Sequence, residues 1–173
     1  MYLVIKFSDI FSHWFMDCLC PLFLNQKVQY NYCLVLCDSA SRWPAAYPLH
    51  SLTAKSVCEA LLKQFAITGV PTIISSDNAS NFKGNLTHEF LKRLGCSPRF
   101  STPNHPATCG LVECLVGTIK SAISKVAREQ PRQWHTHLAC ILWALRESPN
   151  ETTGVPPCFD GLWTSTTRSS GYT

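Results

Sequence analysis

Three short runs rich in apolar, aromatic and β-branched residues follow one another near the start of the chain, before any helical pattern begins. They cover residues 13–19 (HWFMDCL), 30–37 (YNYCLVLC) and 42–49 (RWPAAYPL). Such runs are typical of strands, and their short connections favour antiparallel pairing. The continuous apolar character of 30–37 indicates a central strand, whereas the prolines in 42–49 indicate an edge. The chain must therefore accommodate an antiparallel meander of three strands.

Helical and strand patterns alternate in the remainder of the chain. Thr53 is expected to cap a first helix that Gly69 ends, and the apolar run 72–76 predicts a strand that finishes at Asp77. Further along, the patterns predict a short helix at 86–94, a brief strand at 98–101, and helices at 111–128 and 133–146. The order βββ-α-β-α-β-α-α predicts an α/β fold, with a mixed five-stranded sheet and helices on both faces.

Length and composition favour one folded domain. The chain has 173 residues, of which 46% are hydrophobic and 15% are charged. We expect a domain over residues 1–160, followed by a Ser/Thr-rich tail at 161–173 that is disordered or aberrant. No apolar run reaches the roughly 18 residues of a spanning helix, and no signal peptide is evident. We therefore expect an intracellular protein without a membrane partner.

Ten cysteines occur in the chain. No pair has C-x-x-C spacing, and the chain is neither short nor loop-rich, as a disulfide scaffold would be. The pattern favours reduced and mostly buried thiols.

The positions of three acids among 11 acidic residues are informative. Asp17 lies within an apolar strand, Asp77 ends another strand, and Glu113 is expected in the first turn of the long helix, where the helix dipole favours an anion. Taken singly, each acid could merely open a turn or cap a helix. Together, three carboxylates on two strands and a helix are typical of a site for divalent metal ions, which prefer oxygen ligands.

Four segments carry a resemblance to a known family. SSDNASNF (75–82) and TPNHPATCGLVECLVGTIK (102–120) resemble two segments of the catalytic core of retroviral and gypsy-type LTR-retrotransposon integrases. HWFMDCLCPL (13–22) and YCLVLCDSASRWPAAYPL (32–49) resemble the region of that family around its first aspartate and the strands after it. The 35 residues between Asp77 and Glu113 match the family spacing. Four motifs in order are a specific signal.

The resemblance implies an RNase H-like fold and a polynucleotidyl transferase or endonuclease of the Asp-Asp-Glu type, acting in 3′-end processing and strand transfer during DNA integration. Its catalytic and metal-binding residues would be Asp17, Asp77 and Glu113, holding two Mg²⁺ or Mn²⁺ ions, with no small-molecule cofactor. Asp38 is a rival for the first position, but we expect it to cap the turn to Ser41. The implied partners are the element ends and target DNA, in a homodimer or higher oligomer within the nucleus.

Lys120 is the first candidate for a DNA contact. Helical spacing places it on one face with Glu113, and the resembling family has a lysine at this position. Lys125, further along the same helix, is a second candidate, although it could simply suit the C-terminal end of the helix. The alternative for both is a solvated side chain.

Three polar residues in loops complete the candidate DNA contacts. Asn78 and Asn104 could orient DNA, or could serve only to form turns. His105 matches a family histidine beside the site, with an ordinary loop residue as the alternative. We expect the segment 102–110, which contains two of these residues, to form a mobile loop over the site.

Several positions depart from the family pattern. Cysteine or apolar residues replace glycine, glutamine, arginine or asparagine at Cys20, Ala79, Ala107, Cys114 and Val116. These departures leave an alternative open, in which the chain is a degenerate or host-adopted fragment that binds nucleic acid without catalysis. An RNase H-type nuclease is a third possibility, although the Asp–Glu spacing is typical of integrases.

Overall fold

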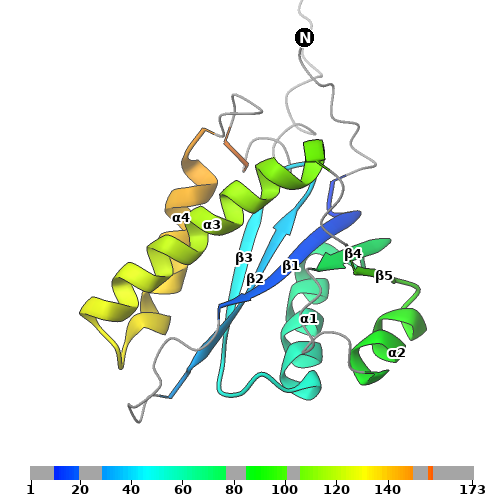
Figure 1. Cartoon of the computed structure of the whole chain (residues 1–173), viewed down its shortest axis with the longest axis horizontal. Helices are drawn as coiled ribbons and strands as arrows, with labels where there is room; N and C mark the ends of the chain where they lie inside the picture. Colours follow the sequence, from blue (N-terminus) through cyan, green and yellow to red (C-terminus); the bar gives the residue numbers. More distant parts are fainter. Residues whose placement is uncertain (1–9, 20–28, 77–84, 101–105, 150–155, 158–173) are drawn as a thin grey trace, which may run out of the picture.

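The computed structural model describes residues 10–19, 29–76, 85–100, 106–149 and 156–157. Its centre is a five-stranded sheet in the order β3-β2-β1-β4-β5 (Figure 1). The strands are β1 (His13–Leu19), β2 (Tyr32–Asp38), β3 (Pro44–Leu49), β4 (Ile73–Ser76) and β5 (Ser97–Phe100). β1, β2 and β3 pair antiparallel, whereas β4 runs parallel to both β1 and β5. The sheet is therefore mixed, as the strand patterns predict.

Helices cover both faces of this sheet (Figure 1). They are α1 (Ala54–Thr68), α2 (Asn85–Arg93), α3 (Pro106–Glu129) and α4 (Leu138–Glu147), with a 3₁₀ turn η2 (Trp134–His137) before α4. One face packs against α1 and α2, and the opposite face packs against α3, η2 and α4. The predicted α/β architecture with helices on both faces is confirmed.

The side chains of the central strand β2 are buried in two hydrophobic clusters, one on each face of the sheet. Leu34 and Leu36 are buried in the cluster with α1, while Cys33, Val35 and Cys37 are buried in the cluster with α3 and α4. Successive side chains of a strand point to opposite faces, so a strand between two helical layers must be apolar at nearly every position. Burial on both faces of the sheet explains why residues 30–37 form the continuous apolar run that indicated a central strand.

α1 begins and ends as its sequence predicts. The Thr53 hydroxyl accepts a hydrogen bond from the Ser56 N–H, and Gly69 ends the helix with φ 83°. A side chain at Gly69 would be strained at this positive φ, which glycine adopts freely. β3 also lies at the sheet edge, as its prolines indicate.

Two helix predictions are wrong in part. α3 begins at Pro106 rather than near residue 111, so residues 106–110 of the expected loop are helical. The fixed φ of proline suits the first helical position, and this favours the earlier start. The predicted helix 133–146 is a 3₁₀ turn followed by α4. Residues 101–105, and the expected tail at 161–173, lie outside the described residues.

Buried side chains on α3 recur at helical spacing, at Val116, Ile119, Ile123 and Ala127.

Among the described cysteines no disulfide forms, and three of the seven are buried, so the thiols there are reduced but less often buried than expected. In this same part of the chain, no helix is both long and apolar enough to cross a membrane.

Candidate active site

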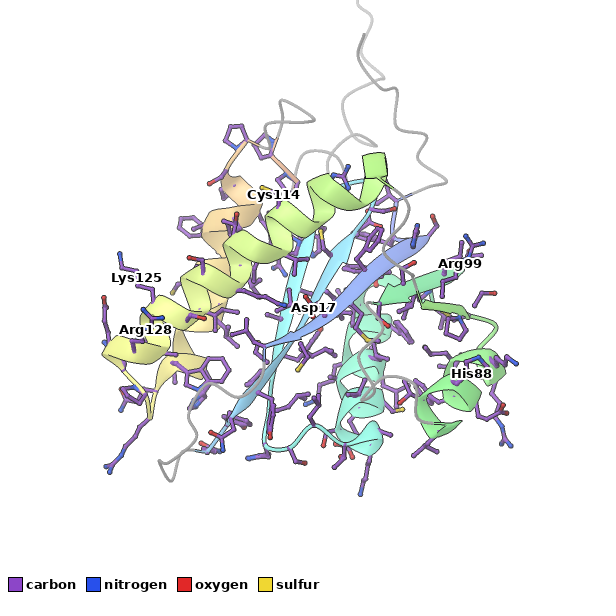
Figure 2. The ribbon with its side chains drawn as sticks, in the orientation of Figure 1. Asp17, His88, Arg99, Cys114, Lys125 and Arg128 are labelled. Carbon is purple, nitrogen blue, oxygen red and sulfur yellow. The ribbon has the colours of Figure 1, made fainter. Side chains whose placement is uncertain are left out.

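Asp17 lies on β1, near the middle of the sheet (Figure 2). By strand alternation it shares a face with Phe15 and Leu19, which pack into the cluster under α3, and it opposes the face of Trp14 and Met16. Its side chain is 27% exposed, so the carboxylate lies at the margin of an apolar layer. A charged group in such a place needs a partner.

Lys120 of α3 provides that partner. Its Nζ donates a hydrogen bond to Oδ2 of Asp17 and forms an ion pair with it, while Oδ1 accepts from the Cys18 N–H at 2.6 Å. The Lys120 side chain is 32% exposed. The structure thus places the predicted lysine beside the first predicted acid, across 103 residues of sequence.

Asp38, the rival acid, is fully buried and engaged in a turn. Its Oδ2 accepts hydrogen bonds from the N–H and the hydroxyl of Ser41, both at 2.7 Å, and Oδ1 accepts from the Phe11 N–H at 3.0 Å. Burial raises the pKa of this carboxyl, while the hydrogen bonds from Ser41 and Phe11 oppose that rise. The expected turn at Asp38 is confirmed, and neither oxygen is left for a metal ion.

The second predicted acid, Asp77, lies outside the described residues, but the strand before it is described. β4 ends at Ser76, which pairs in parallel register with Met16, the residue before Asp17. β4 thus leads the chain toward the part of β1 that carries Asp17. Asn78, Asn104 and His105 also lie outside the described residues.

Glu113 lies on α3, although its side chain is outside the described part. It stands seven residues before Lys120, which is about two turns on the same face of a helix. The expectation of a first-turn position is wrong, because α3 begins at Pro106 and puts Glu113 in the third turn. The helix dipole acts mainly within the first turn and gives no reason for an acid here.

No group of three metal-ligating side chains occurs among the described residues, which include only Asp17 of the three predicted ligands with its side chain. The described carboxylate nevertheless meets one requirement of a cation site. It is partly exposed, and a cation, the ammonium group of Lys120, already contacts it.

Lys125 projects from α3 beyond Lys120, toward the C-terminal end of the helix (Figure 2). With Arg128 and Glu129 it lines a shallow hollow of about 490 Å³, together with the hydroxyl groups of Ser121 and Ser124. Two cations and two hydroxyls can bind phosphate oxygens, although the carboxylate of Glu129 opposes this.

One polar pair on the Asp17 face of the sheet escaped prediction. His13 on β1 hydrogen-bonds through Nε2 to the Ser75 hydroxyl of β4, at 2.8 Å. Burial and the charge of Arg99 on β5 lower the pKa of His13. Only the parallel pairing of β1 with β4 brings these residues together, and sequence spacing carries no signal of that pairing.

Comparisons with known proteins agree with this architecture. Residues 10–106 match the family model of the integrase core domain. The chain is 32% identical over 122 residues to the Gag-Pol polyprotein of Walleye dermal sarcoma virus, covering 69% of the chain and 7% of the relative. It is 32% identical over 123 residues to the Pol polyprotein of Feline endogenous virus ECE1, covering 70% of the chain and 12% of the relative. The chain therefore spans only a small part of these polyproteins.

A solved structure shares the fold. The catalytic core domain of BIV integrase superposes with a TM-score of 0.68 at 19% identity, over 86% of this chain and 92% of that one.

Proposed function

Because the chain belongs to the integrase core domain family, we propose that it is the catalytic core of a retroelement integrase that cuts and joins DNA by polynucleotidyl transfer. The observation that carries this proposal is the position of Asp17. Its carboxylate faces α3 from an interior strand and forms an ion pair with the ammonium group of Lys120 at the margin of an apolar layer. A partly exposed carboxylate of this kind suits metal-dependent phosphoryl chemistry better than it suits packing.

Asp17, Asp77 and Glu113 would hold two Mg²⁺ or Mn²⁺ ions, for which carboxylate oxygens are the preferred ligands. When bound, such ions activate a water or a DNA 3′-hydroxyl and stabilise the leaving oxygen. The contact between Asp17 and Lys120 supports the first of these assignments, because a cation already approaches Oδ2 there. The assignment of Asp77 is supported by its place in the sequence directly after β4, whose last residue, Ser76, pairs with Met16, the residue before Asp17.

Lys120 and Lys125 would bind the DNA backbone, since both project from α3 and ammonium groups bind phosphates irrespective of sequence. Asn78, Asn104 and His105 are proposed to orient the DNA near the acids, on the strength of their motif positions. The substrates would be the element ends and target DNA, which implies action in the nucleus. A homodimer or higher oligomer would bring two such cores to one DNA target.

A non-catalytic fragment remains the second candidate, because two departures from the family pattern lie on α3 close to Glu113. Cys114 is exposed where the resembling family has arginine, and this removes a cation from the helix surface (Figure 2). Val116 is only 6% exposed and packs in the core, so the second departure suits packing. Because both departures lie close to Glu113 in the sequence, turnover has to be tested separately from DNA binding.

The decisive experiment is Mn²⁺-dependent disintegration of a branched DNA by the purified chain, compared with Glu113→Gln and Asp17→Asn. Joining of the DNA strands by the wild type, lost in both variants, supports the proposed function. DNA binding without turnover in the wild type supports the non-catalytic fragment. Cleavage confined to RNA–DNA hybrids indicates an RNase H-type nuclease. Asp38→Asn is not a suitable negative control, because that carboxylate stabilises the fold.

A further inference from the structure

We propose that Arg99 and His13 bind a phosphate of the DNA backbone, on the face of the sheet that carries Asp17. The Ser75 hydroxyl holds the His13 ring in position for this contact. The three residues come from the neighbouring strands β5, β1 and β4. All three lie in the described part of the chain, and none of them is a proposed metal ligand. This inference rests on the DNA-binding part of the proposed function.

The register of three strands puts these side chains on one face of the sheet. Phe15 of β1 pairs with Ser75 of β4, which in turn pairs with Arg99 of β5. Residues that pair across neighbouring strands point to the same side, and so do residues two apart along one strand. His13 and Asp17, each two residues from Phe15, therefore share a face with Ser75 and Arg99.

The part of this face formed by β4 and β5 lies beside α3 rather than under it. The hydrophobic cluster under α3 and α4 takes in side chains of β1, β2 and β3, but none from the described residues of β4 or β5. In Figure 1, α3 and α4 lie over β2 and β3, and β4 and β5 continue the sheet beyond them. Arg99 is exposed here (Figure 2), and within the described residues it forms no ion pair with a carboxylate. Its charge is therefore available to an anion.

His13 is oriented by two neighbours close to that charge. Its Nε2 lies 2.8 Å from the Ser75 hydroxyl oxygen, and its ring stacks on Phe15 with the ring centroids 4.8 Å apart. Burial and the charge of Arg99 lower the pKa of His13 from 6.5, so the ring is neutral at pH 7. With Ser75 donating to Nε2, the single proton of the neutral ring is on Nδ1, which can donate to a phosphate oxygen. Ser75 is only 6% exposed, so it is a positioning residue and not a DNA contact.

The position of Arg99 relative to Asp17 decides which phosphate it can bind. A strand rises about 3.3 Å per residue and neighbouring strands lie about 4.8 Å apart, so the Cα of Arg99, two residues and two strands away, is about 12 Å from that of Asp17. Successive phosphates of one DNA strand advance about 3.4 Å along the helix axis, so a backbone that passes Asp17 reaches Arg99 after about three nucleotides. The site therefore holds flanking DNA and not the phosphate that reacts.

The test measures binding of a fluorescent branched DNA, of the kind used for disintegration, to the full chain by anisotropy at several salt concentrations. Each phosphate that a cation neutralises adds about one to the slope of log affinity against log salt concentration. Arg99→Gln should weaken binding severalfold and lower this slope by about one, whereas Arg99→Lys keeps the charge and should keep the slope. Arg93→Gln is the matched control and should change neither quantity. Arg93 is exposed on α2, which packs on the opposite face of the sheet, and its loss changes the net charge equally.

His13→Phe tests the second phosphate ligand. This variant keeps an aromatic ring beside Phe15 but removes the Nδ1 donor, so DNA binding should weaken. The salt slope should stay at the wild-type value, because a neutral donor releases no counterion. Ser75→Ala should weaken binding in the wild type but cause no further loss in His13→Phe, since Ser75 acts only through His13. An equal loss in both backgrounds would overturn the positioning role of Ser75.

Arg99→Gln decides the proposal, because replacing an exposed arginine leaves the fold intact. The proposal is overturned if Arg99→Gln and Arg93→Gln bind DNA alike. If the wild type joins strands in that case, the proposed function stands and only the phosphate site is wrong. If the wild type binds DNA without joining strands, and Arg99→Gln lowers the slope, the phosphate site is supported and the catalytic function fails. A wild type that binds no DNA overturns both.

Discussion

Asp38 accepts two hydrogen bonds from Ser41 through a single carboxylate oxygen, one from the backbone and one from the hydroxyl. Its other oxygen accepts the Phe11 N–H, so the carboxylate ties the end of β2 to the segment that enters β1. Asp17, 21 residues earlier, instead accepts from Lys120, a partly exposed lysine on α3. Two aspartates on neighbouring strands therefore have different surroundings, a buried turn for Asp38 and a partly exposed ion pair for Asp17.

Asp38→Ala should destabilise the fold far more than Asp17→Asn. Removing the buried acceptor leaves the N–H groups of Ser41 and Phe11 unpaired, at about 1–3 kcal/mol for each. The Asp17–Lys120 ion pair is partly exposed to solvent. Screening by water therefore keeps its contribution to the free energy of unfolding small, about 0–1 kcal/mol. Urea unfolding of the two variants checks the contrast. Equal losses of unfolding free energy would contradict it.

Stability should fall as the pH drops below the ordinary pKa of histidine, in part because of His13. Its pKa in the folded protein is lowered from 6.5 by burial and by Arg99, so the unfolded chain takes up the proton first. The contribution of His13 to the free energy of unfolding is fully present above pH 6.5, and it is lost as the pH falls toward the lower pKa of the folded state. Urea midpoints at several pH values should show a shallower decline for His13→Gln than for the wild type. The same decline in both proteins would show that His13 has no part in it.

The cysteines should divide sharply in their reactivity toward iodoacetamide at pH 8. Burial raises the pKa of Cys33 and Cys37 to about 12, which leaves almost no reactive thiolate, and both thiols are inaccessible. Cys114 and Cys140 are exposed and should react. Site-resolved mass spectrometry of the labelled native protein distinguishes them. Labelling of Cys33 as fast as Cys140 would show that the sheet is not packed under α3 and α4.

Arg146→Lys should loosen α4 from the edge strand. The guanidinium donates from Nε and Nη2 to the Pro44 carbonyl, at 3.2 and 2.9 Å, and lies 4.3 Å from the centre of the Trp43 ring. Lysine cannot reproduce the paired donors or the stacking, so we expect a loss of about 1–2 kcal/mol. Thermal unfolding measures it, with Arg93→Lys on the exposed surface of α2 as the control. A control as destabilised as Arg146→Lys would rule out the specific contact.

The sequence by itself determined the order of the strands and α-helices, the edge position of β3 and the capping of α1. These features depend on local preferences, since side-chain periodicity, prolines and capping residues act within a few positions of the chain. The turn at Asp38 was predictable for the same reason, because Ser41 is three residues away. The start of α3 was not, because the motif 102–110 has the prolines and glycine of a loop, whereas residues from Pro106 on are helical.

Only the tertiary structure decided what Asp17 contacts. Its partner Lys120 is 103 residues away, and His13 meets Ser75 across 62. Such pairs depend on which strands lie side by side and on which face of the sheet a helix packs, and local sequence preferences specify neither. The motifs could therefore identify the candidate acids and the candidate lysine. The packing of α3 on β1 was needed to bring the Lys120 ammonium group to the Asp17 carboxylate.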